Sequence, residues 1–387
     1  TVINGGTASA SKPSTSSTST TPSVSSGRDT TTAMPNATVK DGAASANISG
    51  SLGQDLVNQA VENNSSTVVI APSINGEADQ TSVTIGSSVV GDISKRTDAD
   101  LQVVTPAANV TISNQGLSSL ASKGGSLVVN TAAKGGAIDV TITAGGSVVD
   151  RVSGGVTVEI PANCTAGTVA MLTKADGTTE LLRKSVADAA SGTVTVPLDG
   201  SASITLVDNS KSFGDVPAGN TFANAVAFVS SREIMNGTSS GVFNPSAPMT
   251  RAQLAKVLHN LESNPAAEAG SFSDVTGDAW CAEAVQWASS KGIVTGYADG
   301  SFKPNNYITR EQLAVMLYRY AGSPAVSSTD LRFNDASLVG GYAQAAMVWA
   351  TQNGVINGKG GNMLDPKGQA TRAQVAQMLL NYMSNIG

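Results

Sequence analysis

Three arginines stand where they could bind an anion. Arg251, Arg310 and Arg372 each follow a threonine at the start of an apolar-periodic stretch. An arginine in the first turn of a helix is unfavourable for helix stability, because the positive end of the helix dipole already lies there. A cation beside unpaired N–H groups is, however, a good anion site, and a guanidinium can hold a carboxylate through two parallel hydrogen bonds. The pattern therefore indicates either an anionic ligand or pairing of each arginine with a nearby aspartate that holds neighbouring segments together.

The arginines belong to an internal repeat with a period of about sixty residues. Each copy runs from a Phe-x-Asp through an aromatic-apolar stretch and an Asn/Thr-Gly turn to a Thr-Arg-x-Gln box. The aspartates are Asp215, Asp274 and Asp335, the glycines are Gly237, Gly296 and Gly358, and the threonines are Thr250, Thr309 and Thr371. The first copy has Thr221 where the others have Trp280 and Tyr342.

Each copy is predicted to form helix, loop and helix. The glycine of the turn suits the left-handed conformation at a helix C-terminus. A threonine followed three residues later by glutamine is typical of a capping box at the start of the second helix. Beyond each box, apolar residues recur at helical spacing, so three amphipathic stripes should pack on one another around a common axis.

These motifs resemble the S-layer homology domain in its usual tandem set of three, over residues 211 to 387. The second copy carries the resemblance most fully, with Phe272-Ser273-Asp274-Val275, the loop from Gly296 to Pro304 and Ile308-Thr309-Arg310. The resemblance implies an all-α, pseudo-threefold module that binds secondary cell-wall polysaccharide non-covalently. In this family the polysaccharide is attached to peptidoglycan and often bears pyruvate ketals.

By resemblance, the Thr-Arg pairs, the early aspartates, the turn glycines and Trp280 line grooves between repeats. The boxes depart from the family pattern because all three end in Gln rather than Glu, and only the second loop has an aspartate, Asp299. The groove formed with the second loop is therefore the one we expect to be most complete.

The rest of the chain predicts two further regions. Residues 1–36 are rich in Thr and Ser and indicate a disordered linker or stalk. Residues 37–210 show short β-branched runs such as Thr67–Ile70 and Asn109–Ile112, which predict a β-rich spacer domain. This spacer is expected to be mixed α/β over 37–135 and a β-sandwich over 136–210. The repeats are placed at 211–268, 269–327 and 328–387.

Composition excludes several functions. A formal net charge of −6 with no basic run argues against nucleic-acid binding, and no apolar stretch is long enough to span a membrane. Cys164 and Cys281 fall in different predicted domains and lack metal-ligand spacing, so two separate, half-buried thiols are expected, with a disulfide between them as the less favoured alternative. The chain begins with Thr1, which indicates a processed protein or an excised piece, with something upstream.

The sequence offers little for catalysis. His259 is the sole histidine and falls off the apolar stripe, so we predict a solvated position, no catalytic triad, no metal site and no cofactor. Trp287 and Trp349 are predicted to be core residues. We therefore predict a non-enzymatic protein on the bacterial cell surface that anchors to wall glycan, with neighbouring copies in a surface lattice as a further candidate partner. The alternative is a wall-anchored adhesin or enzyme whose working domain lies upstream or in 37–210, and a third interpretation makes the repeats a purely structural packing module.

Overall fold

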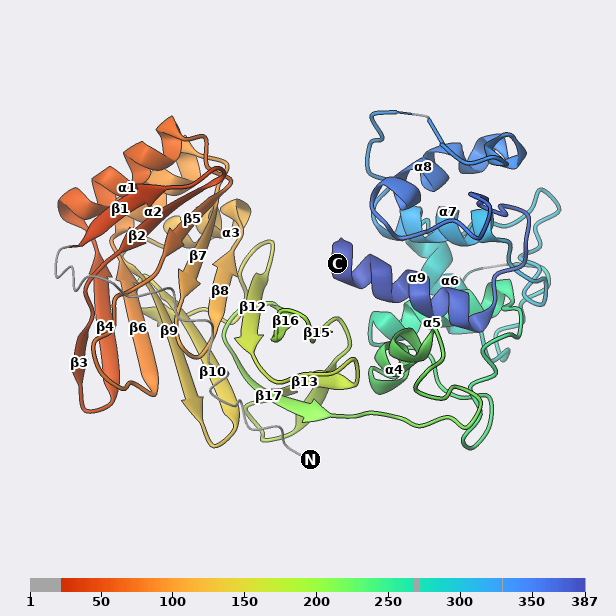
Figure 1. Cartoon of the computed structure of the whole chain (residues 1–387), viewed down its shortest axis with the longest axis horizontal. Coiled ribbons are helices and arrows are strands. Elements are labelled where there is room, and N and C mark those ends of the chain that lie inside the picture. Colours follow the sequence, from red (N-terminus) through yellow and green to blue (C-terminus); the bar gives the residue numbers. More distant parts are fainter. Residues whose placement is uncertain (1–21, 268–269, 271, 329, 387) are drawn as a thin grey trace. The chain divides into compact units, whose positions relative to one another are not determined.

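The computed structural model describes residues 22–267, 270, 272–328 and 330–386. The chain divides into two compact units, one ending at Asp208 and the other beginning at Asn209 (Figure 1). The first unit is built mainly from strands and the second mainly from helices. Each unit is described by itself.

Two sheets form the first unit. The strands of one sheet, in spatial order, are β1 (Ser23–Ser26), β2 (Thr30–Met34), β5 (Thr67–Ile70), β7 (Asp100–Val104), β8 (Asn109–Ile112), β12 (Val156–Pro161), β16 (Thr193–Leu198) and β15 (Val186–Asp188). The other consists of β14 (Thr179–Leu182), β13 (Thr168–Thr173), β17 (Ala202–Asp208), β10 (Ala137–Ala144), β9 (Leu127–Lys134), β6 (Gln80–Ile85), β4 (Ala43–Ile48) and β3 (Thr38–Lys40), with β11 (Ser147–Val148) paired to β10. The strand pairs β2–β5, β5–β7 and β4–β6 are parallel, and the other pairs are antiparallel.

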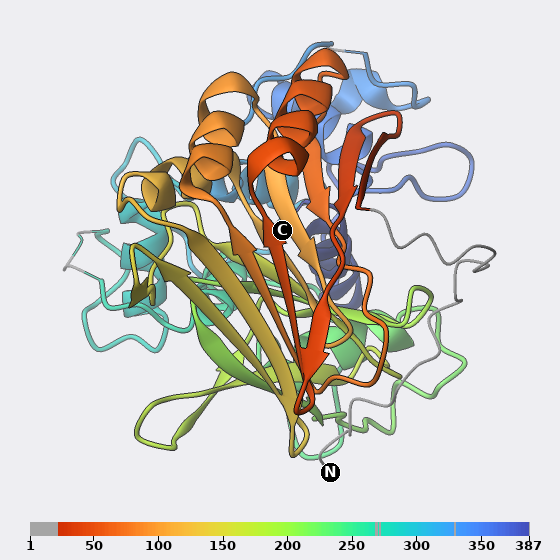
Figure 2. The same cartoon turned by 90° about the vertical axis from the view of Figure 1, so that its left-hand side faces the viewer.

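Three helices close one end of these sheets (Figure 2). Helices α1 (Gly50–Glu62), α2 (Ser87–Arg96) and α3 (Asn114–Ala121) each connect a strand of one sheet to a strand of the other. The strands alternate buried and half-buried residues, as a period of two requires when one face is covered. A single hydrophobic core runs from Ala33 to Leu206 and therefore crosses residue 135, where the sequence suggested a subdivision.

The predicted stalk is wrong for its last part, because β1 and β2 lie within 1–36. β2 is the Thr-rich segment Thr30–Met34, and it pairs in parallel with β5. Thr31 and Ala33 are fully buried, and the Thr31 hydroxyl is 2.8 Å from the Ser65 hydroxyl. Threonine is β-branched and suits a strand. The polar composition of this segment therefore did not prevent strand formation, because its backbone pairs with β5 and the buried Thr31 hydroxyl has a partner. Residues 1–21 of the predicted stalk lie outside the described residues.

Helices in pairs form the second unit. The first helices of the three repeats are α4 (Ala223–Ser231), α6 (Ala282–Ser290) and α8 (Gln344–Gln352), and the second helices are α5 (Arg251–Leu261), α7 (Arg310–Tyr320) and α9 (Arg372–Asn385). Short 3-10 turns, η1 (Ala336–Leu338) and η2 (Gly341–Ala343), precede α8. Each second helix packs on the first helix of the next repeat, and α9 closes the cycle by packing on α4.

A ring of backbone hydrogen bonds ties the three repeats together just before their second helices. Met249 N–H donates to the carbonyl of Ala370, Ala370 to that of Ile308, and Ile308 back to that of Met249, each at 2.9 Å. These residues are fully or almost fully buried. The repeats therefore depend on one another, because each supplies one donor and one acceptor of the ring.

Capping boxes form at all three second helices, as the Thr-x-x-Gln spacing predicts. The hydroxyls of Thr250, Thr309 and Thr371 accept from the N–H of the glutamine three residues on, and that glutamine accepts from the threonine N–H. The apolar stripes behind the boxes are buried, including Leu254, Leu313 and Val375. Trp287 and Trp349 are core residues, as predicted, and Phe228 at the equivalent position of the first repeat is fully buried.

The first helices end earlier than the Asn/Thr-Gly turns predicted. They stop at Ser231, Ser290 and Gln352, and the left-handed residues just after them are Glu233, Gly292 and Gly354. Gly296, by contrast, has no positive φ, and a Cβ there would lie 2.6 Å from a ring carbon of Phe272. The same holds for Gly237 against Phe213 and for Gly358 against Phe333. The turn glycines are therefore required by the close approach of the Phe-x-Asp ring and not by a helix cap.

Candidate functional site

The three predicted arginines bind the loop of the next repeat. Arg251 donates from Nε to the Phe302 carbonyl at 2.9 Å and from Nη2 to the Thr295 carbonyl at 3.2 Å. Arg310 makes the same two bonds to Leu364 and Asn357, and Arg372 makes them to Phe243 and Asn236. Arg372 thus reaches from the last repeat back to the first.

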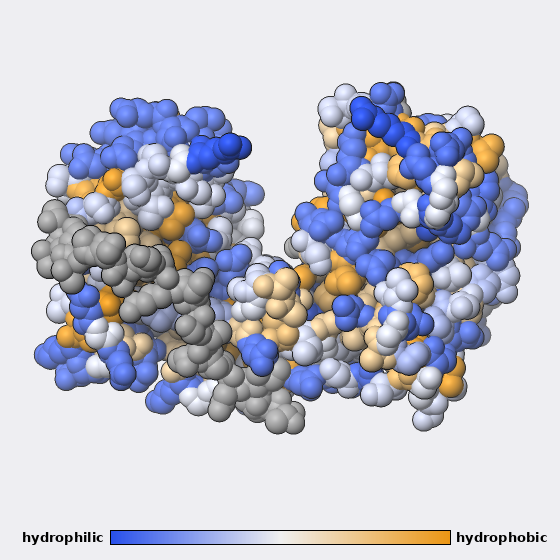
Figure 3. Space-filling model, in the orientation of Figure 1, coloured by the Kyte–Doolittle hydropathy of each residue, from blue (hydrophilic) through white to orange (hydrophobic). Residues whose placement is uncertain are grey.

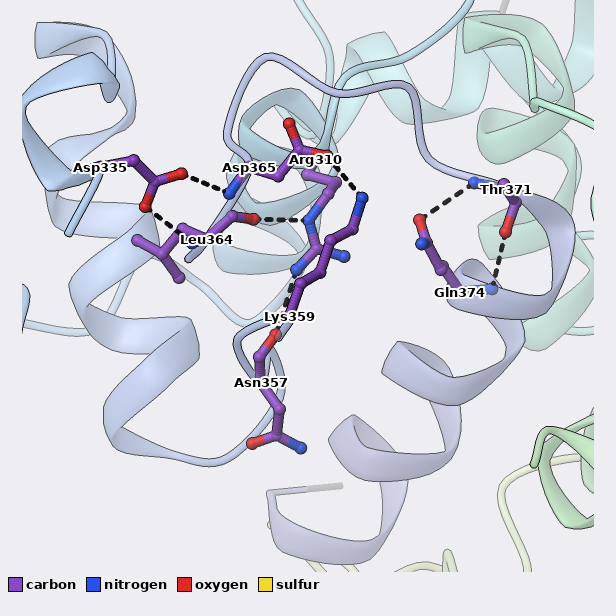
Figure 4. A network of polar contacts seen from close by, with 8 residues as sticks. All are labelled: Arg310, Asp335, Asn357, Lys359, Leu364, Asp365, Thr371 and Gln374. Carbon is purple, nitrogen blue, oxygen red and sulfur yellow. Dashed lines mark hydrogen bonds and ion pairs between the residues drawn. The ribbon is translucent and has the colours of Figure 1, made fainter. Parts of the chain in front are cut away.

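The three predicted aspartates hold the same loops from inside their own repeats. In the third repeat, the Asp335 carboxylate accepts from the N–H groups of Leu364 and Asp365, both at 2.7 Å (Figure 4). The Leu364 carbonyl receives Arg310 at 2.7 Å. Asp274 and Asp215 bind their loops in the same way, at 2.7–2.8 Å and 2.7–2.9 Å.

The aspartate of one repeat and the arginine of the preceding repeat therefore bind the same loop residue. Its N–H donates to the carboxylate, and its carbonyl accepts from the guanidinium. These backbone N–H bonds hold the pKa of Asp215 below its ordinary value, with the Arg372 charge contributing. Burial lowers the pKa of Arg372, which Asp215 partly offsets. The alternative in which each arginine joins the repeats together thus has a structural basis, but the contact runs through the backbone and not through a direct ion pair.

The N–H groups at the start of each second helix are paired, so the expectation of unpaired donors for an anion there is wrong. Arg251 and Ala252 donate to the carbonyls of Asn306 and Pro304 in the next repeat, and Gln253 donates to the Thr250 hydroxyl. Loop carbonyls of a neighbouring repeat take the places that the sequence argument reserved for a ligand, so any anion must be bound by side chains.

A cavity of about 260 Å³ opens beside Arg251. Its lining comes from all three repeats: Arg251, the segment 293–297, Gln312, Val315, Met316, Arg319 and Tyr342. Arg251 as a whole is 8% exposed, and its Nη1 group has no hydrogen-bond partner among the described residues. Because a guanidinium has five N–H donors and the loop carbonyls use two of them, this arginine can hold the ring together and still donate into the cavity.

Aromatic rings flank this cavity. Tyr297 is 37% exposed, and its ring centroid lies 5.2 Å from the guanidinium carbon of Arg251. Tyr342 is 61% exposed, and its hydroxyl donates to Glu311 at 2.7 Å, which fixes the ring. Trp280 occupies the equivalent position one repeat earlier and is 64% exposed, so its ring is open to solvent. An exposed aromatic face beside polar donors is suited to a sugar ring.

Glu311 was not singled out by the sequence, yet it organises this part of the unit. It replaces an alanine of the other two boxes, is 3% exposed, and accepts from the Gly340 N–H, the Lys367 ammonium and the Tyr342 hydroxyl. Its position in the repeat alignment, where Ala252 and Ala373 stand, was the signal that could have identified it.

The prediction for His259 is wrong. The side chain is fully buried, its Nε2 lies 2.8 Å from the Pro265 carbonyl, and its ring packs 5.4 Å from that of Trp287.

The segment Gly237–Gly241 has the Gly-x-Ser-x-Gly spacing of a nucleophile elbow. It follows a helix and precedes a loop, whereas that motif requires a strand-to-helix turn.

Other sequence expectations concern metals, thiols and membranes. Both cysteines are buried and not half-buried as expected, and neither forms a disulfide among the described residues. No cluster of metal-ligating side chains occurs in the described ranges. Among the helices described, none has the length and apolar character needed to cross a bilayer. The visible face of each unit mixes hydrophilic residues with scattered hydrophobic ones (Figure 3).

Comparison with known proteins identifies the repeats. The S-layer homology domain family matches this chain at residues 212–255, 271–314 and 332–376. The second unit therefore carries three S-layer homology domains in tandem, each containing one Phe-x-Asp, one turn glycine and one Thr-Arg.

Relatives of this chain differ in what else they contain. It is 30% identical over 209 residues to an amylopullulanase of Thermoanaerobacterium thermosulfurigenes, which covers 52% of this chain and 11% of that protein. It is 30% identical over 159 residues to the surface-layer 125 kDa protein of Lysinibacillus sphaericus, covering 40% and 13%. A cellulosome-anchoring protein of Acetivibrio thermocellus is 26% identical over 152 residues, covering 38% and 34%. The chain thus spans at most about a third of each of these relatives.

Proposed function

We propose that this chain anchors a protein to the bacterial cell wall by binding anionic secondary cell-wall polysaccharide in grooves of a pseudo-threefold module. The names of relatives support the location: they include surface-layer proteins and a cellulosome-anchoring protein. The family match supports the module. The proposal places the protein outside the cell, at the wall, with glycan as its principal partner.

The cavity beside Arg251 is the observation that carries this proposal. It combines a guanidinium with unused donors, two partly exposed tyrosine rings and a volume of about 260 Å³, which suits a sugar unit better than a whole polymer. The acid group proposed for the ligand is the carboxylate of a pyruvate ketal, which a planar guanidinium can bind through two parallel bonds. By pseudo-symmetry, the proposal extends to Arg310 and Arg372, which occupy the same position in the other two boxes, and Trp280 occupies the repeat position of Tyr342.

Binding at several grooves would add avidity. A polymer with many acid groups can engage a second groove after the first, and the second event is governed by effective concentration and not by bulk concentration. An acidic protein with a formal net charge of −6 would otherwise repel an acidic polymer, so local arginine sites must supply the attraction.

The test is titration calorimetry of the full chain with wall polysaccharide, before and after mild acid removes the pyruvate ketals. We expect binding to the intact polymer and strongly weakened binding to the treated one. Replacing the arginines by alanine is a poor first test, because it also breaks the inter-repeat bonds. Tyr297→Ala removes a cavity wall while leaving those bonds, and Tyr307→Ala is its control, since Tyr307 is 51% exposed and lines neither described cavity.

Binding that is equal for treated and intact polymer, or equal for the two tyrosine variants and the unaltered chain, would contradict the proposal. A purely structural role of the repeats predicts that the chain binds neither polymer.

An alternative is that a longer protein carrying this segment is a wall-anchored adhesin or enzyme. Relatives named as amylopullulanase, exoglucanase and endoglucanase favour it, because in each the match covers a minor part of a much longer protein. On that proposal this chain supplies the anchor. A glycosidase screen of residues 22–208, alongside any flanking domain, would test this alternative.

Self-association of the full chain in a lattice is a separate question, which electron microscopy tests.

A further inference from the structure

We propose that Arg319 is a second ligand-binding guanidinium, so that the cavity beside Arg251 holds the acid group of a sugar between two arginines. This inference rests on the proposed function. The Thr-Arg box does not include Arg319, which stands near the end of α7. The side chain lines the same cavity as Arg251.

Arg319 has no ion pair or hydrogen bond from its side chain to any described residue. It is half-buried, and the two corresponding positions are Asn260 and Asn381. Each of those asparagines donates to a loop carbonyl, at 3.1 Å to Ile234 and at 3.2 Å to Val355. Asparagine at this position therefore has a structural partner, whereas the arginine keeps its five donors available.

The charge around Arg251 also differs from that around its counterparts. Burial is the main reason why the pKa of Arg251 is lowered. Tyr297, Tyr342 and the Asp274 carboxylate offset part of this effect, whereas the Arg319 charge lowers the pKa further. The pKa of Arg310 is affected by two carboxylates, those of Asp365 and Asp335, and not by a second arginine. Figure 4 shows Lys359 alongside Arg310, ion-paired with Asp365 at 2.5 Å. Two like charges sharing one cavity are unfavourable without an anion, and an anion between them relieves that repulsion.

Arg319 also lines a second cavity of about 480 Å³, whose other lining residues include Glu262, Trp287 and Lys291. The two cavities share Arg319 and Ile293. If the acid group of one sugar unit lies at Arg319, the next sugar unit of the polymer can lie in the second cavity. The polymer then continues from the acid-bearing unit on the side away from Arg251.

The experiment is a double-mutant cycle between protein and ligand, measured by calorimetry with the full chain. Arg319→Asn introduces the residue of the other two repeats, so the helix should accept it, and circular dichroism checks this. We expect Arg319→Asn to weaken binding of the intact polymer by about ten-fold to a hundred-fold, the range for losing a charged hydrogen-bond partner. Arg319→Lys should lose less, because it keeps the charge without the planar fork.

The matched control is Arg332→Asn, an exposed arginine of the third repeat that lines neither cavity. On polymer stripped of pyruvate, Arg319→Asn should equal the unaltered chain, since the partner carboxylate is gone. If Arg319→Asn binds intact polymer like the unaltered chain, or if its defect persists on stripped polymer, the inference fails while the proposed function stands. If the unaltered chain binds neither polymer, both fail.

Discussion

Replacing Arg310 by alanine should unfold the second unit at a much lower urea concentration. Arg310 is 3% exposed, and its guanidinium donates two hydrogen bonds, at 2.7 Å to the Leu364 carbonyl and at 3.1 Å to the Asn357 carbonyl. A hydrogen bond from a charged group contributes about 1.5–3 kcal/mol, so two of them contribute roughly 3–6 kcal/mol. Removing a cation from the positive end of the α7 dipole stabilises the helix by at most about 1 kcal/mol. The free energy of unfolding should therefore fall by about 3 kcal/mol.

Tryptophan fluorescence is the assay, because all three tryptophans, Trp280, Trp287 and Trp349, lie in the second unit and report its unfolding alone. With a urea dependence of about 2 kcal/mol per molar, the midpoint should fall by about 1.5 M. Arg332→Ala is the control, since that side chain is exposed in the same unit. A loss for Arg310→Ala of under about 1 kcal/mol, or one equal to the control, would refute the view that these arginines hold the ring together.

Two further predictions follow from single contacts. Gly296→Ala should destabilise the second unit by about 1–3 kcal/mol, because the added Cβ would lie 2.6 Å from the Phe272 ring, whereas Gly277→Ala, with no atom within 4 Å, should not. Equal melting temperatures for the two variants would contradict the close-approach argument. Burial alone would raise the pKa of Glu311, but the Gly340 N–H, Lys367 and Tyr342 hold it below its ordinary value. Its contribution to stability is therefore present above the ordinary carboxyl pKa of about 4.3 and is lost as the pH falls through the folded value. Urea midpoints of the unaltered chain and Glu311→Gln should converge between pH 7 and pH 3, and a gap independent of pH would count against this.

Much of the second unit could be predicted because its signals are local. A capping box joins residues three positions apart, and an amphipathic stripe depends on spacing within one helix. The strands of the first unit were predicted for a similar reason: β-branched runs such as Thr67–Ile70 and Asn109–Ile112 lie at their observed bounds. Helix α2 was missed because its three serines and central glycine weaken its helical pattern.

The sequence alone therefore determined the number of repeats, their helical pairs, their caps and the residues around which function was proposed. Only the tertiary structure decided what those residues contact. Arg372 reaches a carbonyl of Asn236, His259 is buried beside Trp287, and Arg319 enters a cavity with Arg251. These relations join residues far apart in the chain, and they form only when the last repeat closes onto the first. Local patterns carry no information about that closure, because its energy comes from contacts that do not exist until the whole unit has folded.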